Sequence, residues 1–329
     1  MNKRKFLRSA AVAVAVGLAM GILEGAAVAQ DAYPARPVKI VIGFGPGSGT
    51  DLVARMLAEE LSKALGQPFI VENKPGAAAQ IAASQVKAAA PDGYTLLLTS
   101  NTTHSVNPHI FKKLPYDPIA DFTPIGGIGF FPFVLAVDAK IPVTTPQEFV
   151  TWARANKGKV FYAYGTPTVQ IPAEAINRIE KLEATGVGYK SSPDAMTDVI
   201  GGRAQFMVTD LASARPQILG GRLRALATTS SRRTSLAPEL PTIEETLGIR
   251  NFDIAAWTGL FGPANLPKDV VDKLSSVMLN ILNRQDVRER MLAHNIEPTP
   301  SDSVAFRAMV KAQLEMWGEK VKIAGIQAE

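Results

Sequence analysis

The sequence predicts an α/β fold of two lobes, each a mainly parallel sheet flanked by helices, with a cleft between them. Strand-like and helix-like stretches alternate from residue 38 onward, which is typical of parallel sheets covered by helices. Apolar stretches near residues 133 and 253 mark the points where we expect the chain to cross between lobes. The 329 residues, 47% hydrophobic and 20% charged, are enough for two folded units.

The first alternating series has the order βαβαβ. We expect strands over residues 38–44, 68–73 and 94–100, and helices over residues 50–66 and 77–90. The first of these helices has an apolar stripe and signals at both ends. Thr50 or Asp51 is the expected cap, and Gly66 is the expected stop.

The second series follows residue 133. We expect strands over residues 133–138, 159–165, 204–210 and 223–230, a helix beginning at Thr145, a helix from Ala173 to Leu182, and a helix from Ser192 to Gly201. The helix at Thr145 carries a capping box, with Pro146 after the cap and Glu148 three residues after it. In the third helix Ser192 is the expected cap and Gly201 the expected stop.

The chain then returns to the first lobe. A strand-like stretch over residues 254–264 is followed by two long helical patterns over residues 267–284 and 303–325. The second lobe is therefore inserted into the first. We assign residues 30–132 and 253–329 to lobe 1, and residues 133–252 to lobe 2.

Residues 1–29 have the features of a secretory signal peptide. Four basic residues precede an apolar stretch from Ala10 to Leu23, and Ala27-Val28-Ala29 offers a cleavage site. The apolar stretch is shorter than the roughly 20 residues of a membrane-spanning helix. We expect a protein that is free in the periplasm once the peptide is removed, with the general and the twin-arginine export routes both open.

The composition argues against several classes of partner and cofactor. Residues 1–29 hold four basic residues and one acid, so their removal lowers the net charge from +5 to +2. No basic run with interleaved aromatic residues occurs, so we expect no nucleic-acid partner. There is no cysteine, and His104, His109 and His294 lack metal-ligand spacing. We expect neither a metal nor another cofactor.

A glycine-rich loop, "GFGPGSGTD" at residues 43–51, joins the first predicted strand to the first predicted helix. A phosphate-binding loop would need lysine where Thr50 stands, and a nucleophile elbow would need glycine where Pro46 and Thr50 flank Ser48. The dinucleotide fingerprint does not fit these glycines either. A cradle of backbone N–H groups for a carboxylate remains, with a plain structural turn as the alternative.

Two other predicted strands end in candidate side chains. Asp210 closes the strand over residues 204–210 and is expected to face the cleft, although capping of the next helix explains it equally well. The stretch "NTTHS", residues 101–105, follows another strand at the same sheet edge as the glycine loop. Thr102 and His104 are its candidates for ligand contact, and a loop residue with a satisfied ring is the alternative for His104.

Nearly the whole mature chain resembles the Bug receptors, the extracytoplasmic substrate-binding proteins of tripartite tricarboxylate transporters. The matching motifs occur in one order and include "PVKIVIGFGPGSGTDLVARM", "NPHIFKKLPYDPIADFTPI", "VGYKSSPDAMTDVIGGRAQFMVTD" and "PELPTIEETLG". The resemblance implies a two-lobed, type II periplasmic binding protein. Such a protein would capture a small carboxylate and close on it, without catalysis.

The resemblance also implies ligand-binding residues. The matching loop of the first lobe contributes Phe44, Gly45, Gly47, Ser48, Gly49, Thr50 and Asp51. The loop after the strand over residues 159–165 contributes Gly165, Thr166, Thr168 and Gln170, and helix capping is the alternative for the two threonines. This chain departs from the family at Gly45, where proline is usual, and at Gln170, which stands near the family's histidine.

We therefore expect a receptor that holds a dicarboxylate, a tricarboxylate or an aromatic acid by backbone N–H groups and hydroxyls. It would close by a hinge and deliver the ligand, as a monomer, to inner-membrane transporter subunits. A ligand-sensing receptor of a signalling system remains an alternative, and a periplasmic hydrolase is another. The motifs supply no nucleophile with a base, so we assign no catalytic residue.

Overall fold

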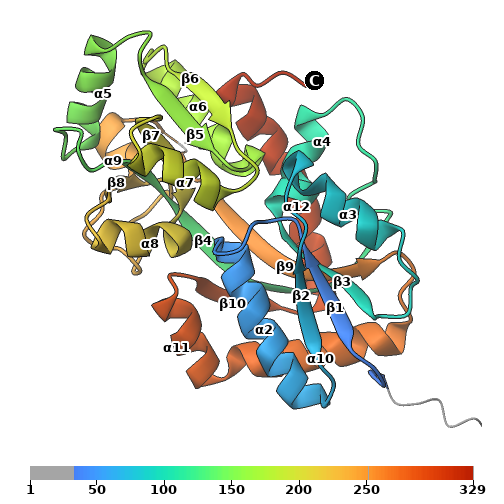
Figure 1. Ribbon diagram of the computed structural model, residues 1–329. Helices are drawn as coiled ribbons and strands as arrows, with labels where there is room; N and C mark the ends of the chain where they lie inside the picture. The colour runs from blue at the N-terminus through green and yellow to red at the C-terminus, as the bar shows by residue number, and fades with distance from the viewer. Residues whose placement is uncertain (1–32, 251, 329) are drawn as a thin grey trace, which may run out of the picture. The chain divides into compact units, whose positions relative to one another are not determined.

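The computed structural model describes residues 33–250 and 252–328 (Figure 1). Arg36–Glu329 form one contact unit, which contains all the secondary structure given below. The predicted signal peptide, residues 1–29, lies outside the described residues. Within the described part of the chain, no helix is long and apolar enough to cross a membrane.

The fold is α/β, as predicted. The strands are β1 (Val38–Ile42), β2 (Phe69–Asn73), β3 (Thr95–Ser100), β4 (Phe122–Asp138), β5 (Phe161–Tyr164), β6 (Thr185–Gly188), β7 (Phe206–Asp210), β8 (Leu223–Thr228), β9 (Ala255–Pro263) and β10 (Glu297–Ser301). The α-helices are α2 (Gly49–Leu65), α3 (Gln80–Lys87), α4 (Asn107–Ile110), α5 (Pro146–Ala155), α6 (Pro167–Ile179), α7 (Ser192–Ile200), α8 (Leu211–Leu219), α9 (Ile243–Leu247), α10 (Lys268–Asn283), α11 (Gln285–Ala293) and α12 (Ser303–Ala324). A short 3₁₀ turn, η1 (Ala77–Ala79), precedes α3, and a π-helical turn, η2 (Thr102–Val106), precedes α4.

The strands form a mixed sheet, not the mainly parallel sheets that the sequence predicted. β1 is parallel to β2 and β3, and β5 is parallel to β6 and β7. β4 and β9, in contrast, run antiparallel to each other and to their other partners, because the chain leaves along β4 and returns along β9. Strand–helix alternation locates crossover connections, but it does not reveal such return strands.

β4 is shared by two groups of strands (Figure 1). Its first part, over residues 122–132, pairs with β9, and its last part, over residues 133–138, pairs with β7 and β8. We call β1, β2, β3, β9 and β10 strand group 1, and β5, β6, β7 and β8 strand group 2. The order β2-β1-β3-β9-β4-β7-β5-β6 joins both groups in one hydrogen-bonded series, so the predicted lobe boundaries stay a prediction.

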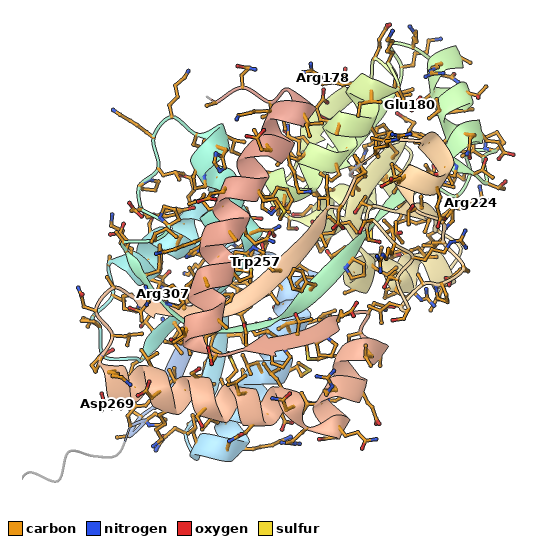
Figure 2. The ribbon with its side chains drawn as sticks, turned by 180° about the vertical axis from the view of Figure 1, so that it is seen from behind. Arg178, Glu180, Arg224, Trp257, Asp269 and Arg307 are labelled. Carbon is orange, nitrogen blue, oxygen red and sulfur yellow. The ribbon has the colours of Figure 1, made fainter. Side chains whose placement is uncertain are left out.

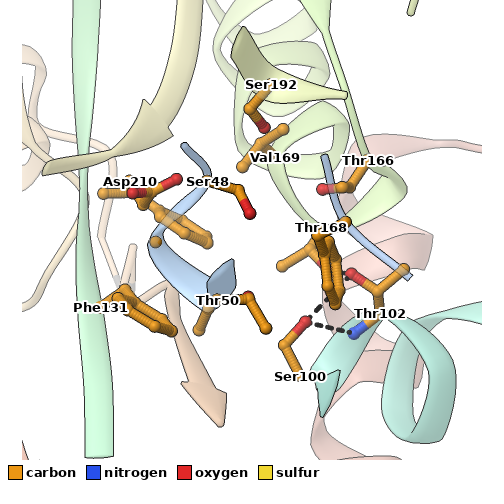
Figure 3. Close-up of a pocket in the computed structure, with 14 residues that line it drawn as sticks. Ser48, Thr50, Ser100, Thr102, Phe131, Thr166, Thr168, Val169, Ser192 and Asp210 are labelled. Atoms are coloured by element: carbon orange, nitrogen blue, oxygen red, sulfur yellow. Dashed lines mark hydrogen bonds between the residues drawn. The ribbon is translucent and has the colours of Figure 1, made fainter. Parts of the chain in front are cut away.

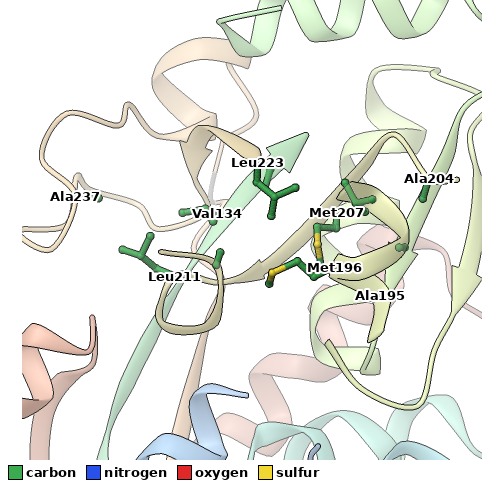
Figure 4. Packing of buried hydrophobic residues seen from close by; sticks show 12 residues of the cluster. Val134, Ala195, Met196, Ala204, Met207, Leu211, Leu223 and Ala237 are labelled. Carbon is green, nitrogen blue, oxygen red and sulfur yellow. The ribbon is translucent and has the colours of Figure 1, made fainter. Parts of the chain in front are cut away.

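Each strand group has its own buried core. In group 1, α12 crosses the sheet over Trp257, and the rings of Trp257 and Phe306 meet edge to face with centroids 5.6 Å apart (Figure 2). In group 2, side chains of β4, β7 and β8 pack with those of α7 and α8, among them Val134, Met196 and Met207 (Figure 4). Burial of these apolar side chains fixes the strands whose ends carry the site described below.

α2 begins slightly earlier than the sequence predicted. Its cap is Ser48, whose Oγ accepts a hydrogen bond from the backbone N–H of Asp51 at 3.2 Å. Thr50 and Asp51, the predicted caps, lie in the first helical turn instead. The helix ends at Gly66 as predicted, in a left-handed conformation (φ 70°) that glycine adopts without steric cost.

The predicted cap is correct for α5 and one residue off for α7. The capping box of α5 is confirmed, with the Thr145 side chain accepting from the N–H of Glu148 and the Glu148 side chain reaching back to the cap. The cap of α7 lies one residue earlier than predicted, because it is Ser191 and not Ser192. Two adjacent serines give the same capping signal, so the sequence alone did not choose between them.

α6 begins at Pro167, six residues before the predicted start at Ala173. Pro172 lies inside the helix, one residue before the predicted start. Pro167 fits the first helical position, where its missing N–H has no partner to lose, and Pro172 removes only one backbone hydrogen bond. The longer helix brings its amino end to the site.

Candidate functional site

A small cavity of about 40 Å³ lies where helix amino ends of the two strand groups meet (Figure 3). Hydroxyl, aromatic and small apolar residues and one acid line it: Phe44, Ser48, Gly49, Thr50, Ser100, Thr102, Phe131, Phe133, Thr166, Thr168, Val169, Ser192, Asp210 and Ala256. Most of them follow the carboxyl ends of β1, β3, β5, β6 and β7. This is the usual place of a ligand site in an α/β sheet.

The cavity brings together eight of the fourteen predicted site residues: Phe44, Ser48, Gly49, Thr50, Thr102, Thr166, Thr168 and Asp210. The other six do not line it: Gly45, Gly47, Asp51, His104, Gly165 and Gln170. Six lining residues were not predicted as site residues: Ser100, Phe131, Phe133, Val169, Ser192 and Ala256. Ser100 ends β3, two residues before the predicted Thr102, and could have been found from that position. The positions of the other five depend on where β4 and β9 lie in the sheet and on how α6 and α7 begin, which the sequence did not reveal.

Asp51 holds the glycine loop and does not face the cavity. One carboxylate oxygen, Oδ2, accepts from the N–H of Gly47 at 3.0 Å and from Arg55 Nε at 3.1 Å. The other, Oδ1, accepts from Asn73 Nδ2 at 2.9 Å. Burial alone would raise the pKa of Asp51, but the hydrogen bonds from Arg55, Asn73 and Gly47 outweigh it and keep that pKa below its ordinary value.

Three of the four glycines in the loop were predicted as site residues, and these three have different surroundings. Gly47 has φ +80° and open space where a Cβ would lie, and its N–H already donates to Asp51. At Gly45 an added Cβ would lie 2.7 Å from the Cβ of Ser191. Only Gly49 lines the cavity, where an added Cβ would lie 2.7 Å from Oδ1 of Asp210. Of these three predicted glycines, only Gly49 is therefore placed where its backbone could contact a ligand in the cavity.

Two predicted residues of the second loop, Gly165 and Gln170, contact other parts of the protein and do not line the cavity. At Gly165 an added Cβ would lie 2.1 Å from the backbone nitrogen of Ser192, so the start of α7 packs against this glycine. The side chain of Gln170 interacts with the hydroxyl of Tyr162 and does not reach the cavity. Both residues support the loop whose threonines line the cavity.

The amino ends of four helices contribute to the lining. α2 supplies Gly49 and Thr50, α6 supplies Thr168 and Val169, α7 supplies Ser192, and Asp210 caps α8. The first N–H groups of an α-helix have no acceptor within the helix, and the helix dipole places partial positive charge at that end. This arrangement suits the negative charge of a small anion.

Hydroxyl groups complete the polar lining. Oγ1 of Thr102 lies 2.7 Å from Oγ1 of Thr168, a hydrogen bond that joins the end of β3 to the start of α6 across the cavity. Ser100 donates to Thr102 at 3.3 Å (Figure 3). Thr166 occupies the cap position of α6, but its side chain makes no capping hydrogen bond. Its hydroxyl therefore does not serve the capping role that was the alternative for this residue.

Asp210 is the one titratable side chain among the lining residues. It ends β7 and caps α8, with its Oδ1 accepting from the N–H of Ser213 at 2.7 Å. Both predicted roles therefore meet in this residue, a helix cap and a side chain that lines the cavity. Burial raises the pKa of Asp210 and outweighs the opposing hydrogen bonds from Ser213.

His104 lies in η2 and is fully buried behind the cavity. Its ring stacks on Phe261 with centroids 4.1 Å apart, and its Nδ1 lies 2.8 Å from Oγ1 of Thr103. Burial lowers the pKa of His104 to about 3, so the ring is neutral at physiological pH. His104 therefore does not line the cavity. Its ring is only partly satisfied, because Nε2 is buried and has no hydrogen-bond partner among the described residues.

Asp51→Asn should destabilise the protein near neutral pH by about 1–3 kcal/mol, because it weakens charge-assisted hydrogen bonds to the glycine loop. The folded-state pKa of Asp51 lies below its ordinary value, so the ionised carboxylate stabilises the fold above about pH 4, and this contribution is lost as the pH falls through the folded pKa. Urea unfolding of both proteins between pH 3 and 7 measures the difference.

The difference between the two proteins should shrink toward acid pH. Asp269→Asn is the matched control, since Asp269 is exposed in the first turn of α10. A constant difference at every pH, or the same pH dependence in the control, would contradict the role given to Asp51.

The chain is similar to solved binding proteins over nearly its whole length. R. palustris Rpa4515 with adipate gives a TM-score of 0.87 at 29% identity, covering 90% of this chain and 100% of that one. The periplasmic binding protein BugD gives 0.85 at 32% identity, covering 90% and 100%. MatC (Rpa3494) from Rhodopseudomonas palustris with bound malate gives 0.81 at 30%, covering 88% and 100%. A family model described as the tripartite tricarboxylate transporter family receptor matches residues 53–326.

Proposed function

Since the chain belongs to the tripartite tricarboxylate transporter receptor family, we propose that it is a periplasmic receptor that binds a small carboxylate without converting it. The family membership confirms the resemblance to Bug receptors that the sequence motifs indicated. The proposal adds that backbone N–H groups and hydroxyls hold the ligand, and that the protein closes around it. It also adds that a monomer delivers the ligand to inner-membrane transporter subunits.

The observation that carries the proposal is the convergence of four helix amino ends on one hydroxyl-lined cavity. N–H groups of the first turn of α2 and α6 are directed to this end of each helix, and the lining contains no lysine, arginine or histidine. A carboxylate would therefore be bound by neutral donors and helix dipoles. The similar proteins Rpa4515 and MatC, which were solved with adipate and malate, support a carboxylate as the ligand.

The lining residues favour binding over catalysis. A hydrolase would need a nucleophile in hydrogen-bond reach of a base. The serines and threonines that line the cavity have no histidine or lysine beside them in that lining, and His104 is packed against Phe261 behind it. Asp210 is engaged as a helix cap.

We further propose that ligand entry separates the two strand groups at the cavity. The cavity is small because the groups touch across it, through the Thr102–Thr168 hydrogen bond and the close approach of Gly49 to Asp210. A space of about 40 Å³ holds only about three water molecules. Opening would break these contacts, and closing on a ligand would restore or replace them.

A thermal-shift screen of the mature protein against a carboxylate panel tests the proposal. The panel should hold dicarboxylates, tricarboxylates, aromatic acids, hydroxy acids and amino acids. A ligand at 100 times its Kd should add about 2.7 kcal/mol to the free energy of unfolding. Calorimetry with product analysis should then give a stoichiometric complex in which the ligand is recovered unchanged.

Two results would contradict the proposal. Turnover of a bound ester or acid would favour a hydrolase, and the absence of binding across the whole panel would remove the receptor function. A separate pull-down with inner-membrane transporter subunits distinguishes transport from signalling, because a sensing receptor should bind a membrane sensor in their place.

A further inference from the structure

We propose that Arg232 and Glu297 form an ion pair when the two strand groups open, and that this pair stabilises the open, unliganded form of the protein. The inference rests on the opening motion in the proposed function, and it adds a pair of residues that sets how strongly the open form is favoured. Its basis is a second cavity on the opposite face of the strands that join the two groups.

The second cavity, of about 480 Å³, lies behind the candidate ligand cavity. β4 passes from one strand group to the other at Pro132 and Phe133, where its pairing changes from β9 to β7. Phe131 and Phe133 line the ligand cavity. Phe130 and Pro132, which alternate with them, line the second cavity. Successive side chains of a strand point to opposite faces, so the two cavities lie on opposite sides of the joining strands. We call the second one the rear cavity.

Both strand groups line the rear cavity. Glu297 and Thr299 come from β10 of group 1, and residues 230–235 come from the loop after β8 of group 2. If the groups rotate about the joining strands to open the ligand cavity, the two walls on the other side of these strands approach each other. The rear cavity should therefore narrow as the ligand cavity widens.

Each wall carries one charged side chain without a partner. Arg232 on the loop and Glu297 on β10 are exposed, and neither side chain makes a hydrogen bond or an ion pair with a described residue. Their nitrogen and oxygen atoms are more than 4.0 Å apart. Arg233, the other arginine of the loop, is already paired with Glu245 at 3.0 Å within group 2. Approach of the walls would bring the unpaired arginine to the unpaired carboxylate.

An exposed ion pair is weak, so this pair would favour the open form without preventing closure. A ligand that binds the closed form must overcome the stability of the open form, and the apparent Kd rises with the population of the open form. Loss of the pair should therefore tighten ligand binding, although neither Arg232 nor Glu297 lines the ligand cavity. Contacts with the ligand would not explain such an effect.

Small-angle X-ray scattering and titration calorimetry on the mature protein test the proposal. Arg232→Glu and Glu297→Arg each place two like charges on the walls of the rear cavity, which disfavours the open form. Each single variant should have a smaller radius of gyration without ligand, and should bind the ligand of the carboxylate screen at least about threefold more tightly. The double variant restores opposite charges, so both measurements should return to the wild-type values.

Lys157→Glu is the matched control, because it changes the net charge by the same amount as Arg232→Glu. Lys157 is exposed in group 2, pairs with Glu183 at 2.5 Å and lines neither cavity. This variant should keep the radius of gyration and the Kd of the wild type. Melting temperatures show whether each variant remains folded.

The inference is overturned if the single variants keep the wild-type radius of gyration and Kd, or if the double variant shows the sum of the two single effects. In either case carboxylate binding itself persists, so the receptor function stands. If no acid of the wider panel binds at all, the proposed function fails, and the scattering comparison alone decides whether the ion pair forms.

Discussion

Gly49→Val should lower the affinity for the carboxylate ligand by at least tenfold, which is about 1.4 kcal/mol. A side chain at this position starts 2.7 Å from Oδ1 of Asp210 and 3.0 Å from the ring of Phe131, so it enters the cavity between the two strand groups. It also stands at the amino end of α2, where first-turn N–H groups are expected to meet the ligand. Calorimetry with the ligand found in the carboxylate screen measures the effect.

Gly47→Val is the matched control, two residues away in the same loop. A Cβ added there meets no atom within 4 Å, and the N–H of Gly47 already donates to Asp51. The positive φ of +80° should make valine costly for stability, but ligand affinity should stay within threefold of the wild type. If Gly49→Val folds cooperatively and still binds as tightly as the wild type, the loop is a structural turn and the ligand lies elsewhere.

The order of the main elements could be predicted because each has a local signal. The strand β1 and the helix α2 follow from apolar periodicity. The glycine stop of α2 follows from helix-capping signals that involve only a few neighbouring residues. The same holds for the capping box at Thr145. Where two residues offer the same signal, as Ser191 and Ser192 do, the predicted cap was one residue off.

The composition of the cavity was predictable only in part, because several of its residues are set by contacts between distant segments. Phe131 and Ala256 reach it through the pairing of β4 with β9. Asp51 was predicted as a site residue from its place in the loop motif. Its carboxylate does not line the cavity because it binds donors that the motif does not show. These donors are Arg55 and Asn73, which ends β2.

Trp257→Ala should lower the free energy of unfolding by about 3–5 kcal/mol, among the largest losses for a single substitution in this chain. Trp257 lies on β9 beneath α12 and is fully buried. Its ring contacts Phe306 edge to face at 5.6 Å and lies 6.2 Å from Phe261, centroid to centroid. Removal of the indole would leave a cavity between the helix and the strand that the neighbouring rings cannot easily close.

Trp257→Phe separates the volume of the indole from its polar atom. The indole Nε1 is buried and has no hydrogen-bond partner among the described residues, so phenylalanine removes an unsatisfied donor while it keeps most ring contacts. The loss should therefore be clearly smaller than in Trp257→Ala. Trp152→Ala on α5 is the control, because Trp152 is only partly buried and should cost less than either. Chemical unfolding followed by circular dichroism gives the three values. Equal losses in Trp257→Ala and Trp152→Ala would mean that α12 is not anchored through Trp257.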